Sequence, residues 1–328
     1  MAESSDPRRG AAPPGALRNP KIEEAIERAA TSGDPAELLA LLERSSGLPA
    51  RRGGARAPGP DLGPSAPLPR TNLELARAVG AAIADRGAAA ERLVRALAAS
   101  GEEYALIVAA QALAAQAARG GDRAKGQRGA SGASGASGAS GASGPLRDLE
   151  QIAEDPRRLV RDGVIAALRT MLAARGDALV AELSSWTDGY LQAHAALEAL
   201  AERTLLTGIS TGAEVVARLE EAFALSDLSP RADERLQGLR LLRQGMPAQI
   251  ATLASRFPEV VRWLEEKTRA ERPESRDVVA QAIAALRKGS FSDAETARLA
   301  AALEASAPPR RDAARVVHGT RKRSKGRR

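Results

Sequence analysis

Residues 155–186 read DPRRLVRDGVIAALRTMLAARGDALVAELSSW, and they contain two apolar stripes separated by a short polar break. In each stripe the apolar residues recur every three or four positions, which places them on one face of a helix. The first stripe consists of Val160, Val164, Ala167, Leu168, Met171 and Leu172, and the second of Leu179, Val180, Leu183 and Trp186. At the break, Gly176 can end one helix in a left-handed conformation and Asp177 can cap the next. Because the break is so short, the stretch predicts two antiparallel helices that pack against each other.

The same combination of stripe, break and stripe occurs three more times. Near the N-terminus the break is SGDP, in which Asp34 is a predicted cap and Pro35 a first-turn residue. Two further pairs are predicted over residues 75–97 and 279–303, and in the second of these Ser292 and Glu295 have the spacing of a capping box. No alternating strand pattern bounded by hairpin turns occurs, so the sequence predicts an all-α protein.

Composition supports a helical fold and narrows the possible chemistry. Aromatic residues make up only 2% of the chain, so the core has to be built from Ala, Leu, Val and Ile. The lack of cysteine excludes disulfides, thiolate metal sites and a cysteine nucleophile. No segment approaches the roughly 18 uninterrupted apolar residues of a membrane span, and the N-terminus has charges and prolines where a signal peptide has an apolar run. We therefore expect a soluble, cytoplasmic protein.

Three segments of the chain are poor in large apolar residues and are expected to be disordered. They are residues 1–19, the Pro/Gly-rich residues 45–70, and residues 120–144, which contain five Gly-Ala-Ser triplets. Glycine at every third position is also found in collagen, but five triplets without proline cannot sustain a triple helix. The triplets therefore predict a flexible linker.

These helices and gaps predict a chain organised as a stacked array. Residues 1–19 are disordered, 20–44 form a helical hairpin, 45–70 a disordered insertion, 71–119 helical repeats, 120–144 the linker, 145–306 a helical array and 307–328 a disordered basic tail. Self-similar helix pairs that each leave one face uncovered are typical of solenoids. The predicted fold class is thus an α-solenoid of antiparallel helix pairs, which needs no single large core.

One segment of the array is specific enough to suggest a family. EDPRRLVRDGVIAALRTM, residues 154–171, resembles the first helix of a HEAT repeat, with its Asp-Pro opening, its Val-Arg pair and the apolar positions that follow. The resemblance is partial elsewhere: SRDVVAQAIAALRKG near Arg276 keeps the ending, whereas Gln192 stands where the family usually has arginine. The resemblance extends chiefly over residues 145–305. It implies a right-handed superhelix of HEAT-like pairs with an extended face for a protein partner.

HEAT-like folds also include DNA glycosylases that excise alkylated bases, and this resemblance implies an alternative function. Those enzymes use an acidic residue near tryptophans in a basic concave groove. Trp186 is close in sequence to Asp188, and Trp263 follows later. The structural interpretation is that Trp186 closes its apolar stripe and Asp188 caps the next helix. Exposure of the tryptophans distinguishes the two interpretations.

Two groups of arginines could form a phosphate-binding ridge. The first group is Arg157, Arg158 and Arg161, and the second is Arg231, Arg235, Arg240 and Arg243. In HEAT-like repeats, however, such arginines often pair with an aspartate of the same or the next repeat. We favour ion pairing or simple solvation for both groups.

Other site chemistry has little support in the sequence. The chain has two histidines: His194 lies in an Ala/Leu-rich helix and His318 in the tail, and neither has the spacing of a zinc ligand or a catalytic triad. The carboxylate pairs Glu220/Glu221 and Glu265/Glu266 are adjacent in sequence, so the members of each pair lie on different helix faces. No phosphate-binding loop motif occurs. We expect no metal, no cofactor and no small-molecule substrate.

The C-terminal tail carries the clearest functional signal. Residues 310–328 contain nine Lys/Arg and one Asp, which account for more than the whole net charge of +7, so the rest of the chain is close to neutral. Such a tail can bind nucleic acid phosphates with little sequence preference, or can merely keep the chain soluble. The candidate phosphate-binding residues are Arg321, Lys322, Arg323, Lys325, Arg327 and Arg328. The sequence predicts a non-catalytic scaffold that binds a protein partner and attaches weakly to DNA or RNA.

Overall fold

The computed structural model describes residues 19–48, 71–128, 143–289 and 291–307, and all regular structure in these ranges is helical, without a strand. This confirms the predicted all-α class. In the N-terminal half the helices are α1 (Pro20–Ser32), α2 (Ala36–Ser45), α3 (Leu73–Ala84), α4 (Ala88–Ala99), α5 (Glu103–Arg128) and α6 (Ser143–Ala153). They continue with α7 (Arg158–Arg175), α8 (Asp177–Glu182), η1 (Leu183–Thr187), α9 (Tyr190–Leu200), η2 (Leu206–Gly208), α10 (Gly212–Asp227), η3 (Arg231–Arg235), α11 (Gln237–Ala254), α12 (Pro258–Lys267), α13 (Pro273–Arg287) and α14 (Asp293–Ala305). None of the described helices is both long and apolar enough to span a bilayer.

The short breaks that the sequence indicated do join consecutive helices. Gly33 has φ 79° after α1, and the Asp34 carboxylate accepts a hydrogen bond from Ala36 N at 2.9 Å at the start of α2. At the start of α14, Ser292 and Glu295 form the predicted capping box. These features are local, since glycine tolerates φ > 0 and short polar side chains satisfy the free N–H groups of a first helical turn.

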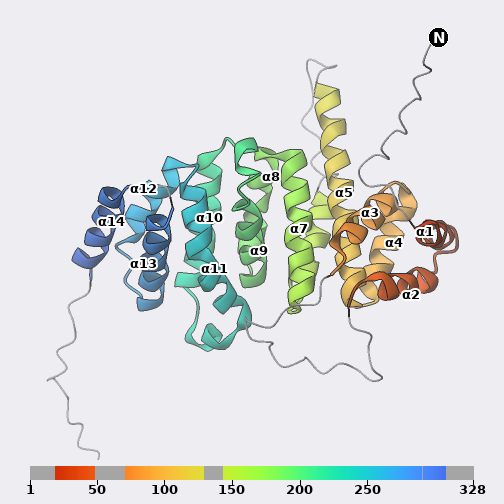
Figure 1. Cartoon of the computed structure of the whole chain (residues 1–328), viewed down its shortest axis with the longest axis horizontal. Helices are drawn as coiled ribbons and strands as arrows, with labels where there is room; N and C mark the ends of the chain where they lie inside the picture. Colours follow the sequence, from red (N-terminus) through yellow and green to blue (C-terminus); the bar gives the residue numbers. More distant parts are fainter. Residues whose placement is uncertain (1–18, 49–70, 129–142, 290, 308–328) are drawn as a thin grey trace, which may run out of the picture.

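Helix α5 lies at the centre of the N-terminal half and belongs to no predicted pair (Figure 1). Every residue from Tyr104 to Ala114 is buried, and α5 packs against α2, α3, α4, α6 and α7. A helix that is apolar on all sides is stable only when other helices surround it. Its helix extends to Arg128 and α6 begins at Ser143, so both helices overlap the ends of the segment 120–144 that the sequence assigned to a linker.

Two glycines allow neighbouring helices to approach α5 closely. A Cβ atom on Gly80 of α3 would lie 2.7 Å from Ala112 N, and one on Gly163 of α7 would lie 2.9 Å from Ile107 Cγ1. Gln111 of α5 is also buried at this contact, and its Nε2 donates a hydrogen bond to Gly163 O at 2.9 Å. Helices α3 and α5 therefore meet almost backbone to backbone, α7 packs directly on the Ile107 side chain, and the buried amide of Gln111 is hydrogen-bonded.

From α5 onward, the odd-numbered helices α5, α7, α9, α11 and α13 each contact the next, and we call them the helix row. On one side of the row, α10 contacts α8, η1, α9, α11, α12 and α13, and α6 contacts α5, α7 and α9. Figure 1 shows these helices side by side along the long axis of the molecule. Each helix thus covers the apolar stripe of its neighbours, and the described part of the chain is elongated.

The break at Gly176 differs in part from the prediction. Helix α7 ends at Arg175 and Gly176 has φ 53°, but the second helix is split into the six-residue α8 and the 3₁₀-helix η1. Asp177 does not cap α8. Its carboxylate accepts hydrogen bonds from Ser210 and Thr211, from the N–H of Ser210 at 2.8 Å and from the Thr211 hydroxyl at 3.0 Å, just before α10. These bonds lower its pKa to about 2 and join the start of α8 to the start of α10.

Candidate interaction surfaces

The six candidate phosphate-binding residues of the tail, Arg321, Lys322, Arg323, Lys325, Arg327 and Arg328, lie outside the described residues, as does His318. What the structure does place is the point from which the tail leaves. Helix α14 ends at Ala305, and Ser306 Oγ donates a hydrogen bond to Thr268 O after α12. Arg276 of α13 also donates to Ser306 Oγ at 3.1 Å. The root of the tail is therefore fixed against the ends of α12 and α13.

Both tryptophans are buried, with exposed fractions of 0% for Trp186 and 4% for Trp263. Trp263 Nε1 donates to Glu220 Oε2 at 2.6 Å, and Lys267 Nζ donates to the other oxygen of the same carboxylate at 2.7 Å. The Trp263 ring also packs edge-on against Phe223 at 5.6 Å. Neither indole is free to stack on a nucleic acid base, and the carboxylate beside Trp263 is already occupied. The arrangement matches the structural interpretation of the tryptophans and lacks the exposed ring that a base-excising site needs.

Asp188 has a different role from the one the sequence suggested. The N-cap residue of α9 is Gly189, and no side chain caps this helix. Asp188 instead ends η1 and is exposed. The predicted cap was therefore wrong, because the extra 3₁₀ turn of η1 shifts the position of the preceding residues relative to α9.

The adjacent carboxylates point to separate partners, as their spacing predicted. Glu220 binds Trp263 and Lys267, whereas Glu221 accepts from Thr187 Oγ1 at 2.9 Å and from Arg218 Nη2 at 2.8 Å. In the described part of the chain, no group of three or more His, Asp or Glu residues is arranged to hold a metal ion.

The first arginine group is engaged within the fold. Arg157 forms an ion pair with Asp155 at 2.6 Å and donates to Gly101 O at 2.9 Å. Arg158 lies 3.9 Å from Asp162, and the buried Arg161 donates to Pro156 O. Arg157 and Arg158 are thus ion-paired, as the sequence favoured, whereas Arg161 is buried and binds a backbone carbonyl.

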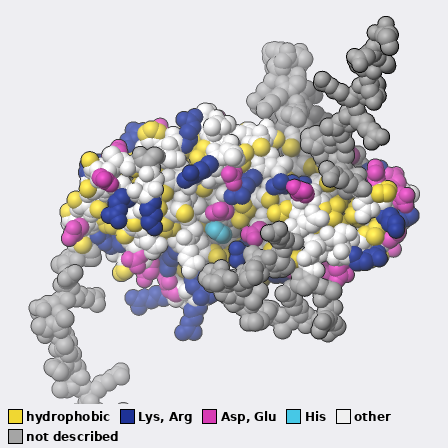
Figure 2. Space-filling model, viewed as in Figure 1, with side chains coloured by type: hydrophobic (Ala, Val, Ile, Leu, Met, Phe, Trp, Pro, Cys, Tyr) yellow, Lys and Arg dark blue, Asp and Glu magenta, His cyan; other side chains and the backbone are white. Residues whose placement is uncertain are grey.

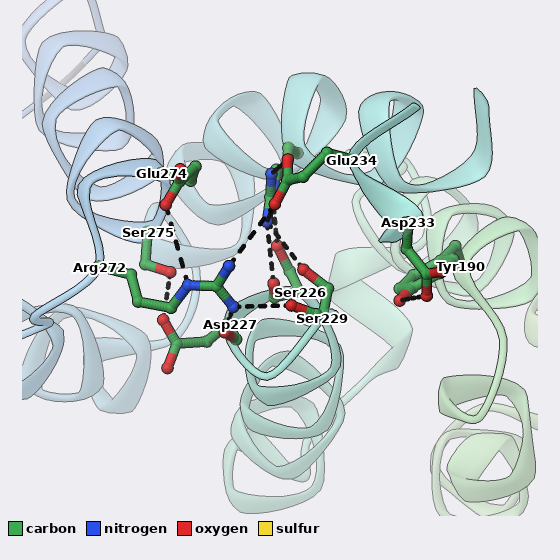
Figure 3. A network of polar contacts seen from close by, with 10 residues as sticks. Tyr190, Ser226, Asp227, Ser229, Asp233, Glu234, Arg272, Glu274 and Ser275 are labelled. Atoms are coloured by element: carbon green, nitrogen blue, oxygen red, sulfur yellow. Dashed lines mark hydrogen bonds and ion pairs between the residues drawn. The ribbon is translucent and has the colours of Figure 1, made fainter. Parts of the chain in front are cut away.

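The arginines of the second group lie in two different environments. Figure 3 shows the polar network at the connection between α10 and α11, residues 228–236, which we call the edge loop. Arg243 donates to Glu234 at 2.7 Å, to Ser226 Oγ at 3.0 Å and to Ser229 Oγ at 3.0 Å. Arg231, Arg235 and Arg240 are exposed instead. Only Arg243 of this group is therefore structural.

Arg272 and a tyrosine complete this network. Arg272 donates to Asp227 O and, at 3.0 Å, to Ser229 O, and it lies 3.5 Å from Glu234. Tyr190 OH of α9 donates to Asp233 Oδ2 at 2.8 Å. Helices α9 and α11 and the N-cap residue of α13 thus all hold the edge loop in place (Figure 3).

Arginines at helix ends recur through the C-terminal half. Arg218 donates to Ala181 O at 3.1 Å, Arg169 to Glu198 O at 3.2 Å, and Arg276 to Ala270 O at 3.1 Å and to Leu303 O. The last carbonyl groups of a helix have no partner within it, and a planar guanidinium with five donors can satisfy several at once. Sequence reasoning missed this role, because a backbone carbonyl leaves no signature in the sequence.

The uncovered side of the helix row carries a narrow polar surface. Helix α9 is enclosed by α7, α10, α11 and η1, and its half-buried polar residues Tyr190, His194 and Glu198 are spaced four residues apart. Glu202, just after the helix, continues this stripe. Arg169 of α7 lies 3.6 Å from Glu198 and 3.2 Å from Glu202. Figure 2 shows positive and negative side chains interspersed on this face. The surface is thus of mixed charge, unlike a groove that follows a phosphate chain.

Burial alters the protonation of this face. Desolvation lowers the pKa of His194, so its imidazole is neutral at pH 7. Desolvation also raises the pKa of Asp162, against the opposing effect of Arg158 and Arg161. The buried Gln249 of α11 donates to Glu198 Oε2 at 2.9 Å and lies 3.5 Å from His194 Nδ1. The contacts of His194 are those of a packed side chain, as its apolar helix suggested.

Two open hollows occur elsewhere on the surface. A hollow of about 430 Å³ lies between α1 and α2 and is lined by Glu27, Arg28 and Asp34 among others. A larger one of about 820 Å³ lies over α5 between α4 and α6, with Leu106, Asp148 and Glu154 in its lining. Both are open to solvent rather than enclosed.

Comparisons with protein-family models, with curated proteins and with solved structures found no match. The function of the chain therefore has to be inferred from its own geometry and charge.

Proposed function

We propose that this chain is a non-catalytic α-solenoid of HEAT-like helix pairs. It binds a protein partner on the uncovered face of the helix row, while its C-terminal tail attaches weakly to nucleic acid without sequence preference. The observation that carries the proposal is the run of contacts from α5 to α13, in which each helix of the row packs against the next. Stacking of this kind leaves an extended face rather than an enclosed cavity.

The chemistry of the uncovered face supports a protein as its partner. Arg169 of α7 forms ion pairs with Glu198 of α9 and with Glu202 just after it, and these pairs fix the geometry of the three side chains. A surface of interspersed charges selects its partner by electrostatic complementarity and supplies no general attraction for a polyanion. Its half-buried side chains lose little conformational entropy on binding.

The tail supports the second part of the proposal through its charge. The described body and the rest of the chain before residue 310 are nearly neutral, so the tail holds the excess cations. Attachment through such cations arises from counterion release, which is weak at physiological salt and falls steeply as salt rises. Deletion of residues 310–328 should abolish most duplex binding and its salt dependence while leaving helicity unchanged.

Affinity capture with three forms of the full chain tests the protein-binding part. Nuclease-treated extracts are passed over the wild type, the tail deletion and Asp162→Lys, with Glu74→Lys on α3 as the matched charge reversal. We expect one partner to be retained by the wild type, by the tail deletion and by Glu74→Lys, and to be lost by Asp162→Lys. A partner that Asp162→Lys still retains at wild-type yield would place the binding surface away from the helix row.

A further inference from the structure

The exposed residues of the edge loop are all apolar or cationic. Its polar and acidic residues bind groups within the fold: Ser229 and Glu234 accept hydrogen bonds from Arg243, and Asp233 accepts one from Tyr190. The residues that remain exposed between 228 and 236 are Leu228, Pro230, Arg231, Ala232, Arg235 and Leu236. The surface that this loop offers to a partner is thus positively charged and apolar.

Two leucines stand at the ends of the edge loop. Leu228 is 79% exposed and Leu236 is 48% exposed, and no other large hydrophobic residue in the described part of the chain is exposed. Single exposed leucines are common on protein surfaces, but these two flank the same short loop. Their position therefore favours a shared function, since both would gain by leaving water.

Three arginines accompany the leucines. Arg231 and Arg235 of the edge loop are exposed, as is Arg240 in the first turn of α11. Within the described ranges of the chain, none of the three has an ion-pair or hydrogen-bond partner for its side chain, whereas Arg243 has several. Figure 2 shows Lys/Arg side chains projecting at the lower edge of the molecule, where Figure 1 places the connection to α11. The full charge of these arginines is available to an anionic partner.

The edge loop is held rigidly in its projecting position. Arg243 binds Ser229 near the start of the loop at 3.0 Å and Glu234 in its 3₁₀ turn at 2.7 Å. Arg272 also donates to Ser229 O at 3.0 Å. A binding surface whose backbone is already ordered does not lose that entropy when a partner binds. The exposed leucines and arginines therefore keep their positions on the projection.

We propose that the edge loop is a peripheral contact for an anionic lipid surface. The two leucines enter the boundary between headgroups and acyl chains, and the three arginines lie at the level of the lipid phosphates. An arginine can do so because its methylene stem packs along apolar groups while its guanidinium stays among the headgroups. Such binding is weak and reversible. It requires neither the protein partner nor the tail of the proposed function.

The shape and chemistry of the loop favour a bilayer over other anionic partners. A bilayer is flat, and a projection at the edge of an elongated molecule can reach it without hindrance from the helices (Figure 1). The backbone of a nucleic acid would attract the arginines as well, but its phosphates offer no apolar environment to the leucines. An acidic protein could cover both kinds of side chain only with a pocket shaped to the projection.

Sedimentation of the full chain with vesicles at low salt tests the cationic part of the contact. The vesicles contain phosphatidylserine or consist of phosphatidylcholine alone. The charge variant is Arg231→Gln/Arg235→Gln/Arg240→Gln, and the matched control is Arg77→Gln/Arg92→Gln/Arg287→Gln, which removes three exposed arginines from α3, α4 and α13. One cation near an anionic bilayer contributes about fivefold, so we expect the charge variant to bind phosphatidylserine vesicles about 100-fold more weakly than the control. The control should bind like the wild type.

A second variant, Leu228→Ser/Leu236→Ser, tests the apolar part of the contact. Its matched control is Leu228→Ile/Leu236→Ile, which keeps the apolar area. We expect the serine variant to lose at least about tenfold in affinity for phosphatidylserine vesicles and the isoleucine variant to match the wild type. Both should bind duplex DNA like the wild type. Circular dichroism should show equal helicity, since all the substituted side chains are exposed, and residues 310–328 contribute equally because every form contains them.

Three results would overturn the lipid contact. The first is a wild type that binds phosphatidylserine vesicles no more tightly than phosphatidylcholine vesicles, and the second is a charge variant that binds like its control. In the third, the serine variant binds vesicles like the wild type while the charge variant loses vesicles and duplex alike. The edge loop would then recognise charge alone, as in binding to nucleic acid or to an acidic polypeptide. The tail deletion tests the proposed nucleic-acid attachment separately, so the two can fail independently.

Discussion

The helices around α5 are positioned mainly by close packing, whereas those between α10 and α14 are linked at their ends by hydrogen bonds from arginines. Gly80 lets α3 approach the α5 backbone, and Gly163 lets α7 pack directly on Ile107 of α5. Two side-chain hydrogen bonds accompany these contacts, from Gln111 to Gly163 O and from Tyr104 to Asn72 O. In the C-terminal region, Arg243, Arg272 and Arg276 each bind groups on two or more elements. Both regions bury aliphatic stripes, so hydrophobic burial alone does not explain the difference.

The difference reflects how the position of each helix is determined in the two regions. An apolar helix surrounded by five others is positioned by steric fit, because dispersion contacts have no direction and only close approach selects a register. Helices near the edge have fewer neighbours, and directional hydrogen bonds at their ends then determine how they are placed. We therefore expect the first region to be sensitive to added volume and the second to lost donors.

The largest effect is expected from Gly163→Val, which adds volume at the contact between α5 and α7. The new Cβ would lie 2.9 Å from Ile107, and the helices would have to separate, which also stretches the bond from Gln111. Overpacking of a core costs about 1–3 kcal/mol, and we expect the upper end of that range. Urea denaturation measures the change, with Gly208→Ala as control because a Cβ there meets nothing within 4 Å.

Arg276→Ala should have the next largest effect, and it tests the second region. The variant removes the side-chain donor of Ala270 O and one of the two side-chain donors of Leu303 O, at a cost of about 1–3 kcal/mol. We expect hydrogen exchange to accelerate in α14 while α5 keeps its protection. Arg287→Ala, at an exposed position on the same helix, is the control. Uniform acceleration across α5 and α14 would mean that the two regions do not differ in the way described.

The contrast between the regions also explains which features the sequence could predict. The stripes of α7 and α13, the turn at Gly176 and the capping box of Ser292 depend on neighbours within a few residues, and they were predicted. Residues 71–119 were predicted to form helical repeats, but α5 was assigned to no pair because a helix that is apolar on all sides has no stripe, so periodicity does not show which face it buries.

The long-range polar contacts could not be predicted for a different reason. Asp177 binds Ser210 and Thr211 more than thirty residues away, and Arg276 binds carbonyl groups that every residue has. The edge loop is an intermediate case. The sequence drew attention to its arginines, but only the structure distinguishes Arg243 from the exposed Arg231, Arg235 and Arg240.

A smaller effect is expected from Asp177→Asn, which weakens the link between α8 and α10. The folded-state pKa of Asp177 is about 2, below its usual value of 3.8, so its carboxylate adds stability above pH 4 that is lost as the pH falls toward 2. Because this side chain is largely solvated, we expect a loss of less than about 1 kcal/mol at pH 7. Denaturation at pH 7 and at pH 2.5 should show the variant and the wild type converging at the lower pH. A constant difference across that range would mean that the charge of Asp177 is not what stabilises the link.

The smallest effect concerns His194, which lies on the helix row between the two regions. Its pKa is lowered by burial, so the folded protein binds a proton less readily than the unfolded chain. Stability should therefore be fully present above about pH 6.5, the usual histidine pKa, and should decline as the pH falls below that value. His194→Gln removes this decline, and the difference between variant and wild type, followed by thermal unfolding from pH 7.5 to 5, measures it. An imidazole buried beside Gln249 also predicts that the NMR shift of the His194 ring titrates at a lower pH than that of an exposed histidine. A ring that titrates near 6.5 would show instead that water reaches the centre of the row, and the uncovered face would then be less firmly packed than either region.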